Sequence, residues 1–267
     1  MTAPFSLLLF ATDPDLVKRA VAAGVGGIVV DRENKGKTDR QRGADTQVNF
    51  DTVEDLRRVR AATDALVICR VNGYGPHTAA EIDECLAAGA DEILLPMVRS
   101  VAEVETTLAL VGDRGGLGIL VETNDAVDIA GALGKLPLAR VYVGLNDLMI
   151  DRGSAHQFEA VADGTVERVR ESFHVPFGFG GLTLPERGAP IPCRLLMSEM
   201  TRLGCSFSFL RRSFLADVRG RDLAVEVPRI AAAMDASARR GTAEAARDLA
   251  DLRTAIRDAR WPARAAS

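Results

Sequence analysis

Eight short apolar runs, spaced along most of the 267-residue chain, constrain its fold more than any other feature. Most of these runs are continuously apolar rather than alternating, a pattern typical of parallel strands that are buried on both faces. We therefore predict eight strands, over residues 6–10, 26–31, 66–72, 92–97, 118–122, 140–144, 175–179 and 206–210.

The segments between these runs carry helical patterns with recognisable start signals. A capping residue before proline predicts one helix start, and two Ser/Thr-x-x-Glu motifs predict capping boxes. The three signals are Asp13 before Pro14 with Gly24 at the far end, Thr78 with Glu81, and Ser100 with Glu103.

Strand and helix therefore alternate, and eight such units in roughly 250 residues match the size of a closed (β/α)8 TIM barrel. The competing fold is an open doubly wound sheet, but no G-x-G-x-x-G follows the first strand. Residues 222–260 read as further helix, rich in Ala, Arg and Asp. We predict a barrel catalytic domain over residues 1–220 and a C-terminal helical extension over 221–267. The extension would pack on its own barrel or on a neighbouring subunit.

Composition argues for a small-molecule partner. A formal net charge of -4 and a pI near 5.5 provide no basic field for nucleic acid or an anionic membrane. The beginning of the chain has no basic leader, and no apolar stretch is long enough to span a bilayer, so we expect a cytoplasmic protein. Four cysteines without a C-x-x-C pair are expected to be reduced and mostly buried, namely Cys69, Cys85, Cys193 and Cys205.

Polar residues gather where the predicted strands end, which in a TIM barrel is where active sites form. Glu122 and Asp147 follow neighbouring strands, so their carboxylates can converge on one point. Such a pair suits Mg²⁺ or Mn²⁺, with Co²⁺ or Fe²⁺ as replacements. The other polar strand-end residues are Asp31, Arg32, Glu33, Arg70, Asn72 and Asn146, with glycines at 178, 180 and 181.

Each of these residues also has a purely structural interpretation. Asp147 could be the N-cap of the next helix, and Glu122 could face solvent at the end of its strand. Arg70 could pair with a core carboxylate, and Asp31 and Glu33 could belong to a solvated turn. Their joint occurrence at one rim favours the functional interpretation. A guanidinium placed between "VIC" and "VN" also favours a planar anionic partner.

Five spaced motifs resemble the HpcH/HpaI aldolase and citrate lyase β-subunit family over roughly residues 6–215. They are "VVDRENKG", "VICRVNG", "GADEILLPMVRSVAEVE", "GILVETNDA" and "RVYVGLNDLMIDRG". The resemblance implies a barrel of the phosphoenolpyruvate/pyruvate type that makes or breaks C–C bonds beside an enolate. It implies a divalent metal held by Glu122 and Asp147, and contact between Arg70 and the keto-acid oxygens. Relatives are commonly hexamers that exchange C-terminal helices, so a homo-oligomer is expected.

One position departs from the aldolase pattern. The aldolase branch typically has D-G-E-H after the second strand, with a His for acid/base catalysis, whereas this chain has Asp31, Arg32, Glu33 and Asn34. Asn34 cannot accept a proton at neutral pH. The base is then a metal-bound water, a carboxylate such as Asp31 or Glu33, or a group from the following loop. The citrate-lyase branch has an acidic motif here, so the chain falls between the two patterns.

Two further segments are candidates for binding substrate anions. The loop over residues 34–47 contains Lys37 and Arg40, which could hold a second carboxylate or phosphate or simply form a solvated surface. Gly180 and Gly181 could let backbone N–H groups approach an anion, or serve a tight turn. His77 is the best placed of the three histidines, but none belongs to the strand-end set.

The sequence thus predicts a divalent-metal-dependent C–C lyase of the class II aldolase type. Its substrate would be a small 2-oxo acid or a hydroxy acid that yields one. Arg70 would stabilise the enolate, and Arg70, Asn72, Asn146, Gly180, Gly181, Lys37 and Arg40 would bind substrate. The alternatives are a citryl-CoA or malyl-CoA type lyase, a non-catalytic metabolite-binding barrel, and a metal-free phosphosugar barrel that uses the glycines after the seventh strand.

Overall fold

The structure is a computed structural model that describes residues 5–34, 51–211, 213–259 and 261. All eight predicted strands are present, each within a few residues of its predicted bounds. They are β1 (Ser6–Phe10), β2 (Gly27–Asp31), β3 (Leu66–Arg70), β4 (Glu92–Leu95), β5 (Gly116–Val121), β6 (Arg140–Val143), β7 (Phe177–Phe179) and β8 (Phe207–Phe209).

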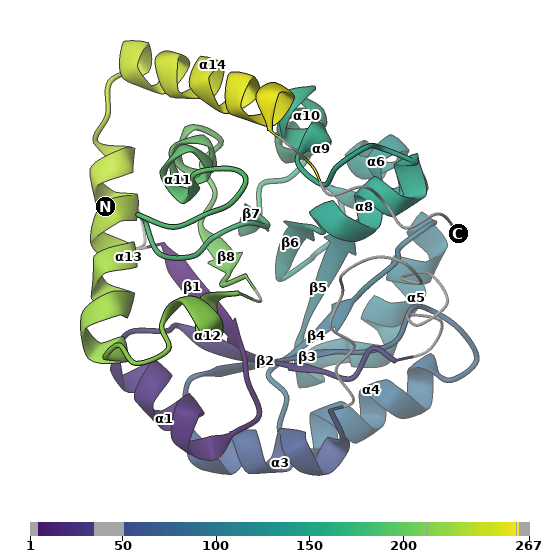
Figure 1. Cartoon of the computed structure of the whole chain (residues 1–267). Helices are drawn as coiled ribbons and strands as arrows, with labels where there is room; N and C mark the ends of the chain where they lie inside the picture. The colour runs from purple at the N-terminus through teal and green to yellow at the C-terminus, as the bar shows by residue number, and fades with distance from the viewer. Residues whose placement is uncertain (1–4, 35–50, 212, 260, 262–267) are drawn as a thin grey trace.

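The strands are all parallel and lie in the order β7-β6-β5-β4-β3-β2-β1-β8. Backbone hydrogen bonds join the two ends of this order: Ser206 N donates to Phe177 O (3.0 Å) and Arg211 N donates to Leu182 O (2.8 Å). The sheet therefore closes into the predicted TIM barrel, with helices around it (Figure 1). The open doubly wound sheet is excluded.

Helices follow the strands in the order that the sequence predicts. Those of the barrel are α1 (Pro14–Ala22), α3 (Val53–Ala62), α4 (Thr78–Ala87), α5 (Val101–Val111), α6 (Asn124–Asp128), α7 (Ala130–Leu133), α8 (Leu145–Arg152), α9 (Glu159–Ala162), α10 (Thr165–Glu171), α11 (Cys193–Arg202) and α12 (Phe214–Asp217). The last two are α13 (Leu223–Ala238) and α14 (Thr242–Asp258). A 3-10 turn, η1 (Gly112–Arg114), follows α5.

Helix start signals were predicted correctly at two of three places. Asp13 caps α1 by accepting a hydrogen bond from Leu16 N at 2.7 Å, and Ser100 and Glu103 form the capping box of α5. The capping box predicted for Thr78 and Glu81 is wrong. Thr78 is already helical, and its hydroxyl accepts from Gly75 N, while Glu81 accepts from Asn72.

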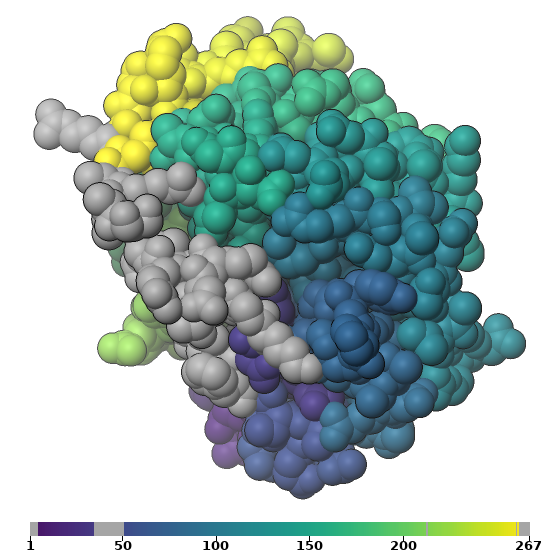
Figure 2. All heavy atoms as spheres, turned by 90° about the vertical axis from the view of Figure 1, so that its right-hand side faces the viewer, coloured from purple at the N-terminus to yellow at the C-terminus, as the bar shows by residue number. Residues whose placement is uncertain are grey.

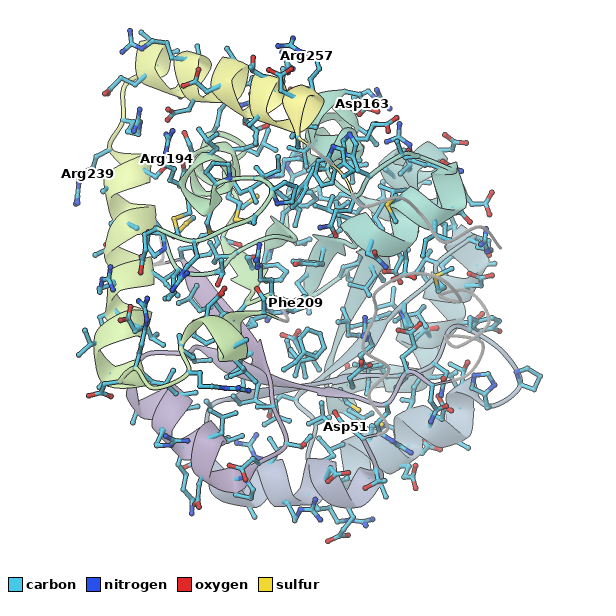
Figure 3. All side chains as sticks on the ribbon, viewed as in Figure 1. Asp51, Asp163, Arg194, Phe209, Arg239 and Arg257 are labelled. Carbon is cyan, nitrogen blue, oxygen red and sulfur yellow. The ribbon has the colours of Figure 1, made fainter. Side chains whose placement is uncertain are left out.

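Side chains divide between two apolar layers because successive strand residues face opposite sides. One layer packs between strands and helices. The other fills the barrel and consists of Leu8, Val29, Ile68, Leu94, Leu120, Tyr142, Phe207 and Phe209. In Figure 3, Phe209 lies inside the ring of strands, whereas Arg239 and Arg257 lie on the outer helices.

A largely buried ion pair lies at the amino end of the barrel. Arg140 donates two hydrogen bonds to the Glu92 carboxylate, at 2.5 and 2.7 Å, and its guanidinium carbon lies 4.9 Å from the centre of the Phe207 ring. This pairing satisfies both charges below the apolar layer. The cavity described below lies at the opposite, carboxyl end of the strands.

The C-terminal residues form two helices rather than one, because the helix ends before Gly241 and resumes at Thr242. Helix α13 packs against α1 and α11, and α14 packs against α11 and α9. The yellow helix α14 in Figure 2 lies directly against the green and teal part of the same chain. In the part of the chain that the structure describes, no helix is long and apolar enough to cross a membrane.

Candidate active site

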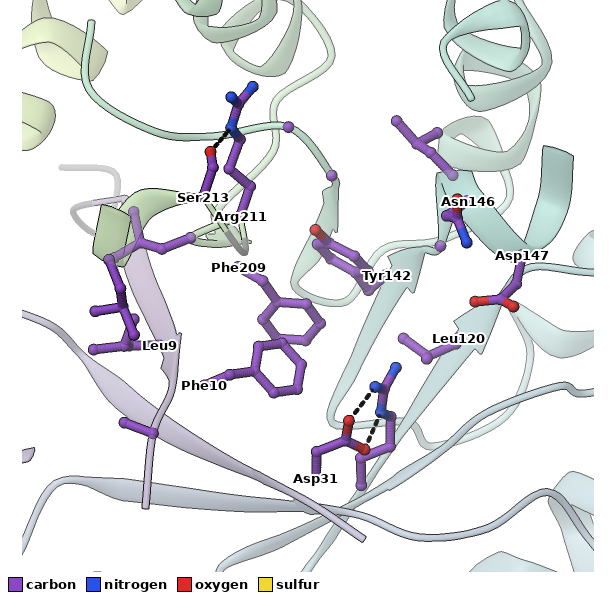
Figure 4. A pocket seen from close by; sticks show the side chains of 18 of the residues that line it. Leu9, Phe10, Asp31, Leu120, Tyr142, Asn146, Asp147, Phe209, Arg211 and Ser213 are labelled. Atoms are coloured by element: carbon purple, nitrogen blue, oxygen red, sulfur yellow. Dashed lines mark hydrogen bonds and ion pairs between the residues drawn. The ribbon is translucent and has the colours of Figure 1, made fainter. Parts of the chain in front are cut away.

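A cavity of about 640 Å³ opens at the carboxyl ends of the strands. The alternation of strand residues explains which side chains reach it, because Asp31, Arg70 and Glu122 continue the inward-facing series of β2, β3 and β5. Asp147, Asn146, Gly180 and Gly181 also line the cavity. Seven of the predicted site residues thus meet in one hollow (Figure 4).

Arg70 forms a tight pair with Asp31 within this cavity. Its Nε and Nη2 atoms donate to the two carboxylate oxygens of Asp31 at 2.8 and 2.6 Å, and Nη1 lies 3.5 Å from Glu33 Oε2. Burial by itself would lower the pKa of Arg70, but the attraction of Asp31 and Glu33 outweighs it and the pKa is raised. Arg70 is therefore a permanent cation, held in a fixed plane.

Asp31 and Glu33 are buried rather than parts of a solvated turn, with exposures of 1% and 3%. Asp31 is also fixed from its backbone, because its N–H donates to Asp51 Oδ2 at 2.9 Å. The structure thus places both carboxylates around Arg70, which corrects the solvated-turn alternative. Arg70 also lies over the Phe10 ring, with its guanidinium carbon 5.3 Å from the ring centre.

Glu122 is a buried carboxylate that faces other carboxylates. It directly follows β5, is 2% exposed, and accepts a hydrogen bond from Met97 N at 2.9 Å. Burial, and then repulsion by Asp147 and Glu33, raises its pKa well above the ordinary value; Arg70 and the Met97 N–H only partly oppose this. The alternative that Glu122 faces solvent is wrong.

Two backbone features near Glu122 leave room for its carboxylate. A Cβ atom added to Gly144 would lie 2.2 Å from Glu122 Oε2, so a larger residue at that position would displace the Glu122 side chain. Met97 has a φ of 55°, an uncommon conformation for a residue other than glycine, and this conformation accompanies the hydrogen bond to Glu122. Backbone constraints of this kind are concentrated at functional sites.

Asp147 lies in the first turn of α8, one residue after Asn146, and not at the end of β6 itself. Strand β6 ends at Val143 and Gly144 is the N-cap, so the alternative that Asp147 caps the helix is wrong. In Figure 4, Asn146 and Asp147 lie on the side of the cavity across from Phe10. The Asn146 Nδ2 atom is buried without a hydrogen-bond partner among the described residues.

The donor set of this cavity fits a hard divalent cation. Repulsion by Asp147 is the second cause of the raised Glu122 pKa, after burial, and a cation held by both carboxylates would offset that repulsion. Mg²⁺ and Mn²⁺ typically take one or two carboxylates and keep other positions for water and substrate oxygens. Within the described ranges, no group of three or more His, Cys, Asp or Glu side chains forms a larger metal-binding cluster.

Some predicted residues lie elsewhere. Asn72 lines a smaller hollow beside the cavity, and its amide binds Glu81 and the backbone N–H of Asn34. His77 lines that same smaller hollow. Lys37 and Arg40 lie outside the described residues.

Several residues that line the cavity were not predicted from the sequence. Tyr142 and Phe209 contact each other at 4.1 Å between ring centres, and Phe10 packs on Phe209. Burial raises the pKa of Tyr142, so it stays a phenol. Arg211 follows β8 and donates to Ser213 Oγ at 2.5 Å. Phe10 and Arg211 could have been found by applying the strand-end rule to the first and eighth strands.

Comparison with solved structures identifies the fold in other proteins. An HpcH/HpaI aldolase from Desulfitobacterium hafniense DCB-2 matches with a TM-score of 0.62 and 17% identity, over 81% of this chain and 90% of that chain. The citrate synthase SbnG matches with a TM-score of 0.61 and 16% identity, over 85% and 94%. A tryptophan synthase from M. tuberculosis matches with a TM-score of 0.55 and 15% identity, over 88% and 92%.

These likenesses confirm, at the level of the fold, the barrel that the sequence motifs imply. No protein-family model matches the sequence, and a sequence search of curated proteins finds no match. A barrel of this kind supports many reactions, as the tryptophan synthase illustrates. The reaction must therefore be argued from the residues of the cavity.

Proposed function

We propose that this chain is a divalent-metal-dependent C–C lyase of the class II aldolase type. It would cleave or form a bond next to the pyruvate-like enolate of a small 2-oxo or hydroxy acid. The observation that carries the proposal is the buried Glu122 carboxylate, which faces Asp147 and lies in the same cavity as the paired cation Arg70. The fold shared with an aldolase and a citrate synthase supports the same reaction class.

Glu122 and Asp147 would hold Mg²⁺ or Mn²⁺. When bound, this cation would act as a Lewis acid that polarises the keto group of the substrate. Arg70 would stabilise the negative charge that grows on the enolate oxygen, since its guanidinium is preorganised by Asp31 before substrate arrives. We assign Asp31 and Glu33 to positioning Arg70, because both carboxylates lie against its guanidinium.

The substrate would contact both polar and apolar residues of the cavity. Arg70 and the carboxylates supply the polar groups of the cavity, and the rings of Phe10, Tyr142 and Phe209 supply apolar ones. The apolar rings would exclude water from the reacting carbon atoms, which strengthens the electrostatic contribution of Arg70. Asn146 Nδ2, with no partner among the described residues, would donate to a substrate oxygen.

Proton NMR of pyruvate in D2O tests the proposal without any assumption about the second substrate. We expect loss of the methyl signal when the protein and Mg²⁺ or Mn²⁺ are present, and none after addition of EDTA. Glu122→Gln and Asp147→Asn should abolish the exchange and weaken metal binding measured by calorimetry. Glu105→Gln, an exposed carboxylate on α5, is the matched control and should retain both.

The contrary outcome is also informative. If the protein binds the cation but does not exchange the methyl protons, the absence of the aldolase-branch histidine at Asn34 is decisive. The proposal for pyruvate chemistry then fails, and a thioester substrate or a non-catalytic barrel takes its place. If metal binding survives Glu122→Gln unchanged, the assigned metal site is wrong.

A further inference from the structure

Two cysteines that are sixteen residues apart in sequence touch each other in the layer between sheet and helices. Cys69 lies on β3 and Cys85 on α4, and both are 0% exposed. The Cys69 thiol points to Cys85, with the two sulfur atoms 3.3 Å apart. A disulfide bond is about 2.05 Å long, so the atoms need to approach by only roughly 1.2 Å. The pair lies outside the residues that line the candidate active site.

A cation makes the two sulfur atoms unequal. Arg32 Nη1 donates to Cys85 Sγ at 3.1 Å, and Arg32 Nη2 pairs with Glu84 at 2.5 Å. The hydrogen bond from Cys69, with help from Arg32, lowers the pKa of Cys85 in spite of its burial. The pKa of Cys69 is raised, first by the same hydrogen bond and then by burial. Cys85 is thus the nucleophile, and Cys69 carries the proton.

The other two cysteines differ from this pair. Burial raises the pKa of Cys193 to about 11 and that of Cys205 to about 12. Such thiols behave as small apolar groups and react slowly. Cys193 and Cys205 therefore serve as controls in the same chain for the effect of the Arg32 contact on cysteine oxidation.

We propose that Cys69 and Cys85 form a peroxide-sensitive site, primed by Arg32, that closes to an intramolecular disulfide. The Cys85 thiolate attacks one oxygen of hydrogen peroxide; the O–O bond breaks, and the hydroxide that leaves takes up a proton to give water. Cys69 then attacks the sulfur of the Cys85 sulfenic acid, the S–O bond breaks, and the thiol proton completes a second water. Two thiols are oxidised and one peroxide is reduced.

The Cys69–Cys85 pair and Arg32 are adjacent in sequence to residues of the candidate active site. Arg32 stands between Asp31 and Glu33 in sequence, and Cys69 immediately precedes Arg70. Forming the disulfide removes the thiolate that Arg32 contacts, although Glu84 remains its partner. The chemistry itself does not depend on the proposed lyase function, so the two can be tested separately.

The test uses the full chain, reduced, desalted and exposed to hydrogen peroxide. Free thiols are then labelled with N-ethylmaleimide in denaturant, and the peptides are mapped by mass spectrometry without reduction. We expect the four free thiols to fall to two, with the Cys69 and Cys85 peptides joined within one chain and released by dithiothreitol. Four remaining thiols, or oxidation of Cys193 or Cys205 at the same rate, would overturn the proposal.

Variants separate the two roles. Cys69→Ser should block the disulfide and leave a Cys85 sulfenic acid that dimedone traps, whereas Cys205→Ser should keep the disulfide. Arg32→Met should slow oxidation of Cys85 severalfold, because it removes a hydrogen bond and a positive charge that stabilise the thiolate. Arg57→Met, an exposed arginine on α3, is the control. An unchanged rate in Arg32→Met would contradict the role assigned to Arg32.

Discussion

Arg70 and Glu122 illustrate how burial decides what a charged side chain can do in this barrel. Arg70 is compensated, because Asp31 occupies two of its donors and Glu33 lies beside a third. Glu122 is not compensated to the same extent, because burial, and then its carboxylate neighbours, raise its pKa more than Arg70 lowers it. Arg70 is therefore held in place by its partners, whereas the charged form of Glu122 is unfavourable. A bound cation would offset part of that cost.

Replacing Arg70 should lower the stability of the folded protein. Arg70→Met removes a buried cation that pairs with Asp31 and lies beside Glu33, and we expect a loss of about 3–5 kcal/mol in the free energy of unfolding, measured with urea. The double variant Arg70→Met/Asp31→Asn should recover part of the loss. Arg58→Met, which removes an exposed pair with Asp55, should cost less than about 1 kcal/mol. Equal losses for Arg58 and Arg70 would contradict this ranking.

Glu122 should make the metal-free protein less stable as the pH rises from about 4.5 toward neutral. Its folded pKa is raised, so the folded state binds more protons than the unfolded state, and stability falls as the pH rises above the unfolded pKa near 4.5. The loss is about 1.4 kcal/mol for each unit of the shift. In EDTA, Glu122→Gln should therefore unfold at a higher temperature than the native chain at pH 7–8. The difference should shrink toward pH 4.5 and on addition of Mn²⁺.

At the scale of elements, the ends of strands hold the site in position. After β4 the chain turns through Met97 with a positive φ, which directs its N–H to Glu122. After β6 the chain passes Gly144, where a side chain would collide with the same carboxylate. The segments that follow β4 and β6 therefore together fix the position of the Glu122 carboxylate.

Substitution at Met97 tests this arrangement. Met97→Gly should be tolerated, because relief of the positive φ, about 1 kcal/mol, offsets the loss of a half-buried side chain. Met97→Val should lower stability by about 1–2 kcal/mol, because a β-branched residue resists this conformation. Thermal unfolding and metal titration would report both effects. Better metal binding in the valine variant than in the glycine variant would contradict the proposed link to Glu122.

At the scale of the whole molecule, the C-terminal helices complete the outer layer of their own barrel. Leu252 and Ile256 of α14 are buried, and Ser198 of α11 donates to Asp248 of α14 at 2.7 Å. Helix α13 joins the same core through Val227 and Ile230. We still propose that the chain forms a homo-oligomer, which light scattering with and without α14 would test.

Leu252→Ala should cost about 2–5 kcal/mol, the usual range for a cavity in a packed core. Because the contacts of Leu252 lie within one chain, the change in unfolding midpoint should not depend on protein concentration. Arg253→Ala, on the exposed side of α14, should leave the midpoint nearly unchanged. A loss in Leu252→Ala that disappears on dilution would mean that α14 packs on a neighbouring chain instead.

The sequence by itself determined the strands, their parallel arrangement and most of the polar residues at the carboxyl ends of the strands. Continuous apolar runs report burial on both faces, and the strand-end rule needs only the place where each run stops, so Asp31, Arg70 and Glu122 were all found this way. Local signals failed where a side chain had a better distant partner. Thr78 and Glu81 match a capping box as well as Ser100 and Glu103 do, yet Glu81 binds Asn72.

Only the tertiary structure decided which partners these residues have. The Arg70–Asp31 pair joins residues 39 positions apart, and the Cys69–Cys85 contact joins a strand to the helix after it. No local sequence signal indicates the positive φ of Met97. None indicates that Asp147 lies in a helix rather than on a strand. The physical reason is that periodicity reports which face a residue occupies, whereas distances between side chains depend on how the closed barrel positions every strand.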